Sequence, residues 1–162
     1  MTDDELKIEF DALGLSLEDY RVVMLLPLVH VAWSDGSLHA GERRVILRVA
    51  EAQGLADSDT LQRWLADSPD SEFWERGKTV LRELGRRKRI EPDELKRVLD
   101  QAEAVARAAG GLFGMMSIEA RERAALKEIS GALSAETNGL RNILGSRRGH
   151  AAVEYSLLVG LV

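Results

Sequence analysis

Apolar residues along this chain recur mostly at the three- and four-residue spacing of helices, and the alternation typical of strands is nearly absent. The run over 17–33 is hydrophobic on so many sides that it predicts one central, buried helix, which begins at the start signal of Ser16. A narrower apolar stripe predicts a second helix over 40–53, which Gly54 ends.

Further along the chain, turn residues separate four more stretches with helical spacing. They predict a short helix over 58–65, a helix from about 72 to 84, a helix that Pro92 opens and Gly110 ends, and a helix over 118–133. We therefore expect an all-α, internally duplicated bundle of about six to seven helices over 1–134, a linker over 135–149 and an apolar C-terminal helix over 150–162.

Two short segments of the chain resemble each other. Residues 37–43 read Ser-Leu-His-Ala-Gly-Glu-Arg and residues 117–123 read Ser-Ile-Glu-Ala-Arg-Glu-Arg, with four identities at the same offsets. A decayed duplication is the simplest explanation. It predicts that the helix pairs over 17–53 and 92–133 are related by an approximate two-fold axis, with Glu42 and Glu122 at equivalent helix starts.

Composition narrows the functions that this chain of 162 residues could have. With no cysteine, any metal must be held by oxygen or by histidine. The net charge of −5 argues against a nucleic-acid partner, and we interpret the basic cluster at 86–89 as a helix end. We find no nucleophile–base pair, phosphate loop or zinc motif, which predicts a non-enzymatic protein. The N-terminus has no secretory signal, so we expect a cytoplasmic location.

The stretch after the central apolar run is acidic and allows two interpretations. In one, Asp35 hydrogen-bonds its own turn, Gly36 takes a backbone conformation that other residues avoid, and Glu42 favours the start of the next helix. In the other, Asp35 and Glu42 coordinate calcium, magnesium or manganese, and His39 is either a third ligand or a solvent-facing residue. Zinc fits this oxygen-rich set less well.

Residues 25–55 combine an apolar helix, an Asp-Gly turn and a helix that opens with glutamate, and they resemble the TerB-like family. Residues 110–114 with 117–123 look like the second half of the same family. The resemblance implies an all-helical, internally duplicated domain linked to tellurite resistance and stress response, with acidic residues proposed to bind metal. Carried over by position, the candidate ligands are Asp35, Glu42, Glu119 and Glu122. Met115 stands where the first repeat has Asp35, so the second turn lacks its leading carboxylate.

Other residues with reactive or aromatic side chains have simpler interpretations. We expect His30, inside the apolar run, to be a hydrogen-bonded core histidine. Met115 and Met116 are expected to fill core. Three tryptophans are interpreted as core or groove aromatics: Trp33, Trp64 and Trp74.

The last residues, 147–162, resemble the processing site of Flp/Tad-type pilins, in which a basic leader ends in glycine. On that pattern Gly149 precedes the cut, and Glu154 and Tyr155 match the signature. The apolar run is shorter than the roughly twenty residues that span a bilayer. One alternative is a helix that packs on its own domain. The other is self-association, a protein partner or membrane contact through 150–162, which would place a cytoplasmic protein at the membrane.

Overall fold

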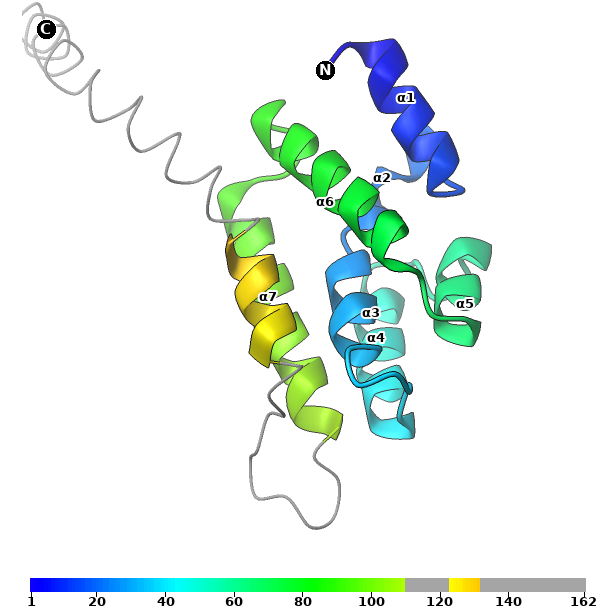
Figure 1. The fold of residues 1–162 in the computed structure, drawn as a ribbon, viewed down its shortest axis with the longest axis vertical. Helices are drawn as coiled ribbons and strands as arrows, with labels where there is room; N and C mark the ends of the chain where they lie inside the picture. The colour runs from blue at the N-terminus through cyan, green and yellow to red at the C-terminus, as the bar shows by residue number, and fades with distance from the viewer. Residues whose placement is uncertain (110–122, 132–162) are drawn as a thin grey trace, which may run out of the picture.

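The computed structural model of this chain describes residues 1–109 and 123–131, and these residues are mainly helical (Figure 1). No strand occurs within these two ranges, which confirms the predicted all-α fold class. A further helical stretch covers 123–131. The labelled elements are α1 (Asp3–Ala12), the 3-10 helix η1 (Leu17–Asp19), α2 (Tyr20–Val23), α3 (Leu26–Ala32), α4 (Ala40–Ala52), α5 (Asp59–Ala66), α6 (Ser71–Arg86) and α7 (Pro92–Ala109).

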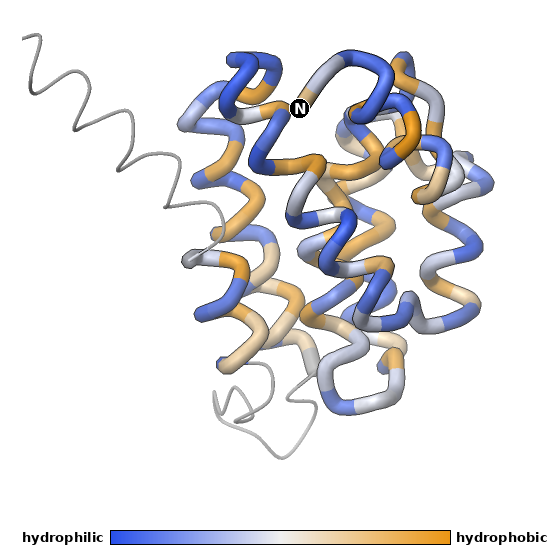
Figure 2. The backbone as a smooth tube through the Cα atoms, turned by 45° about the horizontal axis from the view of Figure 1, so that its top comes forward, coloured by the Kyte–Doolittle hydropathy of each residue, from blue (hydrophilic) through white to orange (hydrophobic). Residues whose placement is uncertain are grey.

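Helix α3 lies at the centre of the bundle. Its most extensive contacts are with α7, and it also touches α4 and α6. Helix α7 in turn packs along α4. Helix α1 packs on α6 at the edge of the molecule (Figure 1). Figure 2 shows hydrophobic and hydrophilic stretches alternating along the helices, as expected where each helix buries one face. None of the described helices is both long and apolar enough to cross a membrane.

The run over 17–33 is not the single helix that its pattern predicts. It forms η1, α2 and α3, with the break between Val23 and Leu26. At the break Leu25 N–H donates to Val22 O, three residues back, and Pro27 has no N–H with which to continue an α-helical ladder. Pro27 instead lies in the first turn of α3, where no intrahelical donor is needed. The expectation of burial is confirmed for 22–32, where every residue except His30 is buried, but not for 17–21, which are exposed or partly exposed.

Helix α1 was not predicted by the apolar pattern, because it buries only Leu6 and Phe10. A capping box starts it: Glu5 N–H donates to Thr2 Oγ1 at 3.2 Å, and Thr2 N–H donates to Glu5 Oε2 at 2.7 Å. These two bonds satisfy backbone donors that the first turn would otherwise leave unpaired. The polar residues before the helix therefore determine where it begins.

The basic cluster at 86–89 lies at the C-terminal end of α6, as expected. Two of its members are also structural: Arg86 and Arg87 both donate to the buried Glu83, and together they lower the pKa of that carboxyl group to about 2. Arg87 also donates to Asp3 and to Met1 O, at the start of α1. The cluster thus fixes the N-terminal segment on α6.

Helices α3 and α6 approach closely at Gly77. A Cβ atom at this position would lie 2.1 Å from Leu26 Cδ2, and Leu26 is itself buried. Gly77 therefore allows the two helices to approach this closely, although glycine weakens a helix interior by about 1 kcal/mol relative to alanine.

We predict that Gly77→Ala lowers the free energy of unfolding by about 1–3 kcal/mol, because the added methyl group overpacks the interface with Leu26. Urea denaturation would measure this. The matched control is Gly131→Ala, where a Cβ atom would meet nothing within 4 Å and the variant should be at least as stable as the wild type. Equal stability of Gly77→Ala and the wild type would contradict the prediction.

Candidate functional site

The acidic turn, residues 33–39, joins the end of α3 to the start of α4. Asp35 Oδ1 accepts the backbone N–H of Ser37 at 3.0 Å, so this aspartate hydrogen-bonds its own turn. Gly36 has φ of +91°, in the left-handed region that residues with a Cβ rarely adopt. The backbone of the turn therefore requires both residues of the Asp-Gly pair.

The turn also brings the side chains of Asp35 and His39 together. Oδ2 of Asp35 lies 2.9 Å from Nε2 of His39, whose side chain is half exposed. Partial burial of Asp35 would raise its pKa, but the hydrogen bonds from Ser37 N–H and from His39 outweigh this effect and hold the pKa below its usual value. Asp35 is therefore an ionised carboxylate at neutral pH, and it faces an imidazole.

Glu42 lies in the first turn of α4, as expected, and its side chain is fully buried, at 0% exposed. Its Oε2 accepts the backbone N–H of His39 at 2.8 Å, which caps the helix and puts negative charge at its positive end. The two carboxylates of the turn thus bind two parts of one residue: Asp35 its imidazole and Glu42 its backbone.

The structure brings Asp35, His39 and Glu42 into one turn without forming a complete metal-binding set. Among the residues that the structure describes, no group of three or more histidine, aspartate or glutamate side chains is arranged to hold an ion. The other two candidate ligands, Glu119 and Glu122, lie outside the described residues, as do Met115 and the linker and tail over 135–162. The two-fold relation between Glu42 and Glu122 therefore stays a prediction.

A second polar cluster lies away from the turn, and sequence patterns did not indicate most of it. His30 of α3 stacks on Trp74 of α6, with ring centroids 4.0 Å apart and an interplanar angle of 9°. Glu128, from helix 123–131, accepts from Trp74 Nε1 at 2.8 Å and from Lys78 Nζ at 2.6 Å, and its Oε2 lies 3.5 Å from His30 Nε2. We call His30, Trp74, Lys78 and Glu128 the cross-helix cluster.

Burial and the hydrogen bonds of the cross-helix cluster shift the pKa values of its members in opposite directions. Burial lowers the pKa of His30, although the neighbouring Glu128 carboxylate acts in the opposite direction. Burial would raise the pKa of Glu128, but the bonds from Lys78 and Trp74 outweigh it and lower the pKa. His30 is thus a partly buried histidine in contact with a carboxylate, close to its predicted role. Only its position inside an apolar helix pointed to it, since its partners lie far along the chain.

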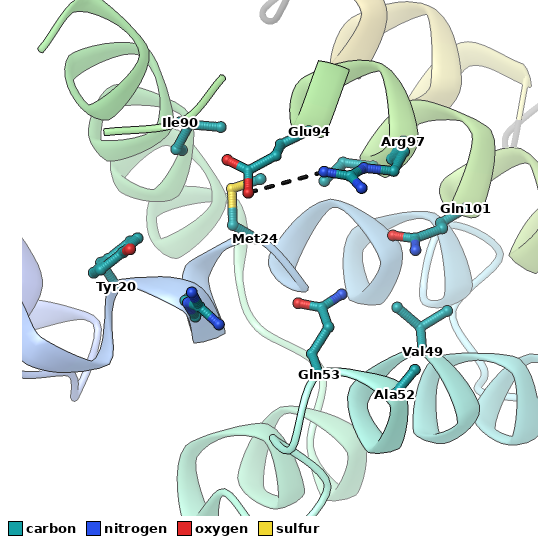
Figure 3. A pocket seen from close by; sticks show the side chains of 11 residues that line it. Tyr20, Met24, Val49, Ala52, Gln53, Ile90, Glu94, Arg97 and Gln101 are labelled. Carbon is teal, nitrogen blue, oxygen red and sulfur yellow. Dashed lines mark ion pairs between the residues drawn. The ribbon is translucent and has the colours of Figure 1, made fainter. Parts of the chain in front are cut away.

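The described part of the chain also has a groove of about 260 Å³ at the other end of α4, between α2, α4 and α7 (Figure 3). Met24 and Val98 are among its buried lining residues. Arg97 and Glu94 form an ion pair of 3.9 Å in the groove. Asp35, His39 and Glu42 do not line this groove, so it is separate from the acidic turn.

No protein-family model, curated protein or solved structure matches this chain. The TerB-like resemblance therefore depends on the two sequence motifs.

We predict that Asp35→Asn destabilises the domain by about 1 kcal/mol at neutral pH, because it loses the charged partner of Ser37 and His39. The pKa of Asp35 is lower in the folded state than its usual value of 3.8. The stabilisation is therefore present when the pH is above 3.8 and is lost as the pH falls through the folded-state pKa. Urea denaturation at about pH 7, 5 and 3 should show the difference from the wild type shrinking at the lowest pH.

Asp57→Asn, at an exposed aspartate outside the turn, is the control and should show little difference at any of these pH values. A difference between Asp35→Asn and the wild type that is as large at about pH 3 as at about pH 7 would mean that the carboxylate charge does not stabilise the turn.

Proposed function

We propose that this chain is a non-enzymatic, TerB-like helical module that binds a divalent cation at the acidic turn between α3 and α4. The observation that carries the proposal is the pair of Asp35 and His39, whose Oδ2 and Nε2 atoms lie 2.9 Å apart at a turn that is partly open to solvent. Both groups are common metal ligands, and the carboxylate is ionised at neutral pH, as a ligand must be.

In this proposal the cation replaces the hydrogen bond between Asp35 and His39. Asp35 supplies an oxygen and His39 a ring nitrogen, while Glu42 holds the His39 backbone in place through its 2.8 Å hydrogen bond. Glu119 and Glu122, which the family resemblance adds, would supply further oxygens, and water would fill the remaining positions. Carboxylates favour calcium, magnesium or manganese, and participation of His39 would shift the preference toward manganese or zinc.

Calorimetric titration of the whole chain with calcium, manganese and zinc tests the proposal. We expect the wild type to bind at least one of them, and Asp35→Asn combined with Glu42→Gln to abolish binding, because Asp35 loses the charge of its ligand oxygen and His39 loses the charged partner that holds its backbone. His39→Gln should weaken manganese or zinc more than calcium, which prefers oxygen ligands.

Asp57→Asn, outside the turn, should bind as the wild type does. Circular dichroism would establish that each variant is folded, and Asp35→Asn alone gives a milder change than the double variant. The metal function is wrong if the folded wild type binds none of the three ions, or if the double variant binds them unchanged.

A second candidate is a structural or interaction protein in which the turn is architectural. It is favoured by the hydrogen bonds of Asp35 and Glu42 to Ser37 and His39, which close the turn without an ion. In this case the apolar segment 151–162, which lies outside the described residues, would carry the function by contacting a partner chain or a membrane. Burying each large aliphatic side chain of such a segment favours association by about 1.5–3 kcal/mol.

We predict that deleting residues 146–162 leaves the melting temperature of the domain nearly unchanged and abolishes self-association or recovery with membranes. Light scattering would measure the mass in solution, and co-sedimentation with anionic lipid vesicles would measure membrane binding. A melting temperature many degrees lower would instead place this segment in the core of its own domain and contradict the docking role.

A further inference from the structure

Helix 123–131 depends on its contacts with the rest of the bundle. In proteins, most of the stability of a helix comes from the packing of its apolar face against other elements. Within 123–131, only Ala125 and Ile129 are buried. Helices α3 and α6 bury several large side chains each. Apolar burial therefore holds 123–131 less strongly than it holds the central helices.

The Glu128 carboxylate attaches this helix to its neighbours. Glu128 lies on the exposed side of its own helix, yet it receives hydrogen bonds from Trp74 and Lys78 of α6 and lies beside His30 of α3. Lys78 is largely buried, with 9% of its side chain exposed, so a nearby negative charge is worth more there than at the surface.

The face that Glu128 contacts, formed by His30, Trp74 and Lys78, can exist without Glu128. Lys78 Nζ also donates to Glu75 of its own helix at 2.5 Å, so the buried cation keeps a carboxylate partner when Glu128 leaves. The stacked rings of His30 and Trp74 belong to α3 and α6, which pack on each other independently of 123–131. Release of the helix therefore need not leave an unpaired buried charge, the most costly consequence of separating an ion pair.

The face also extends beyond the contact with Glu128. A groove of about 240 Å³ begins at the His30–Trp74 stack and continues to Trp33 and the loop before α6. No residue of helix 123–131 lines this groove. A ligand that places a carboxylate where Glu128 lies could therefore gain apolar contact that the internal helix does not use.

We propose that helix 123–131 is a latch that opens separately from the rest of the domain, and that the face of His30, Trp74 and Lys78 beneath it is a receptor for a carboxylate carried by an amphipathic helix. The chain's own Glu128 occupies that receptor in the closed state. A partner helix fits when it presents a small residue three positions before a glutamate and an aliphatic residue directly after it, as Ala125, Glu128 and Ile129 do.

Hydrogen exchange on the whole chain tests whether the latch opens by itself. In the wild type, the amides of 123–131 should exchange faster than those of α4 and α6, since a weakly held helix opens without global unfolding. Glu128→Gln should speed exchange in 123–131 by about tenfold or more and leave α4 and α6 unchanged, because the lost bonds involve charged groups. Lys127→Gln, at the neighbouring exposed position, is the matched control. It should change the exchange rates neither in 123–131 nor in α4 and α6.

Either of two exchange results would overturn the latch. In the first, 123–131 exchanges at the same rate as α4 and α6 in the wild type. In the second, Glu128→Gln speeds all the helices equally, which would make Glu128 a part of the common core.

A peptide tests the receptor. The sequence of 123–131, stabilised as a helix by a covalent link between exposed positions 123 and 127, should bind the Glu128→Gln chain about tenfold or more tightly than the wild-type chain, whose receptor is occupied. The same peptide with glutamine at position 128 should bind neither chain. Fluorescence anisotropy of a labelled peptide measures both. Failure of the glutamate peptide to bind the Glu128→Gln chain, or equal binding of the glutamine peptide, would contradict the receptor.

Discussion

Burial of α3 is the constraint on which the other elements depend. Six of its seven residues are buried, and α7, α4 and α6 pack around it. A helix covered on this many sides has few positions where polar chemistry is possible. In α3 these are His30, the one residue that is not fully buried, and the turn that follows Ala32. The acidic turn and the cross-helix cluster therefore both include the polar positions that α3 offers.

The residues of the Ser-Leu-His-Ala-Gly-Glu motif also have structural roles that do not require a ligand. Glu42 caps α4, and Gly41 lets the start of α4 approach the end of α7, where a Cβ atom would lie 2.7 Å from Ala108 O. The second copy of the motif has Arg121 at the place of Gly41, and this position lies outside the described residues. In the first copy the motif thus starts and packs α4, and His39 is the motif residue that would contribute a ligand to the proposed metal site.

Local signals in the sequence predicted most of the helix boundaries, because caps act over one turn. Ser58 and Asp70 accept from N–H groups three residues on, and Pro92 opens α7, close to the expected positions. The break before α3 was not predicted, since the apolar run continues unchanged across it. Glu128 was not predicted as a partner of His30 because nothing in a sequence connects residues almost a hundred positions apart.

The candidate metal site could be predicted as a set of residues but not as a geometry. Sequence spacing placed Asp35, His39 and Glu42 together, and the structure shows how they share hydrogen bonds. Any cation that takes Asp35 and His39 must first displace the bond between them, so the stability of the empty turn directly reduces the affinity for the ion. Glu42 binds only the His39 backbone and need not move in that exchange. The turn would then keep the same backbone conformation with and without the ion. The ion would replace a hydrogen bond without refolding the loop.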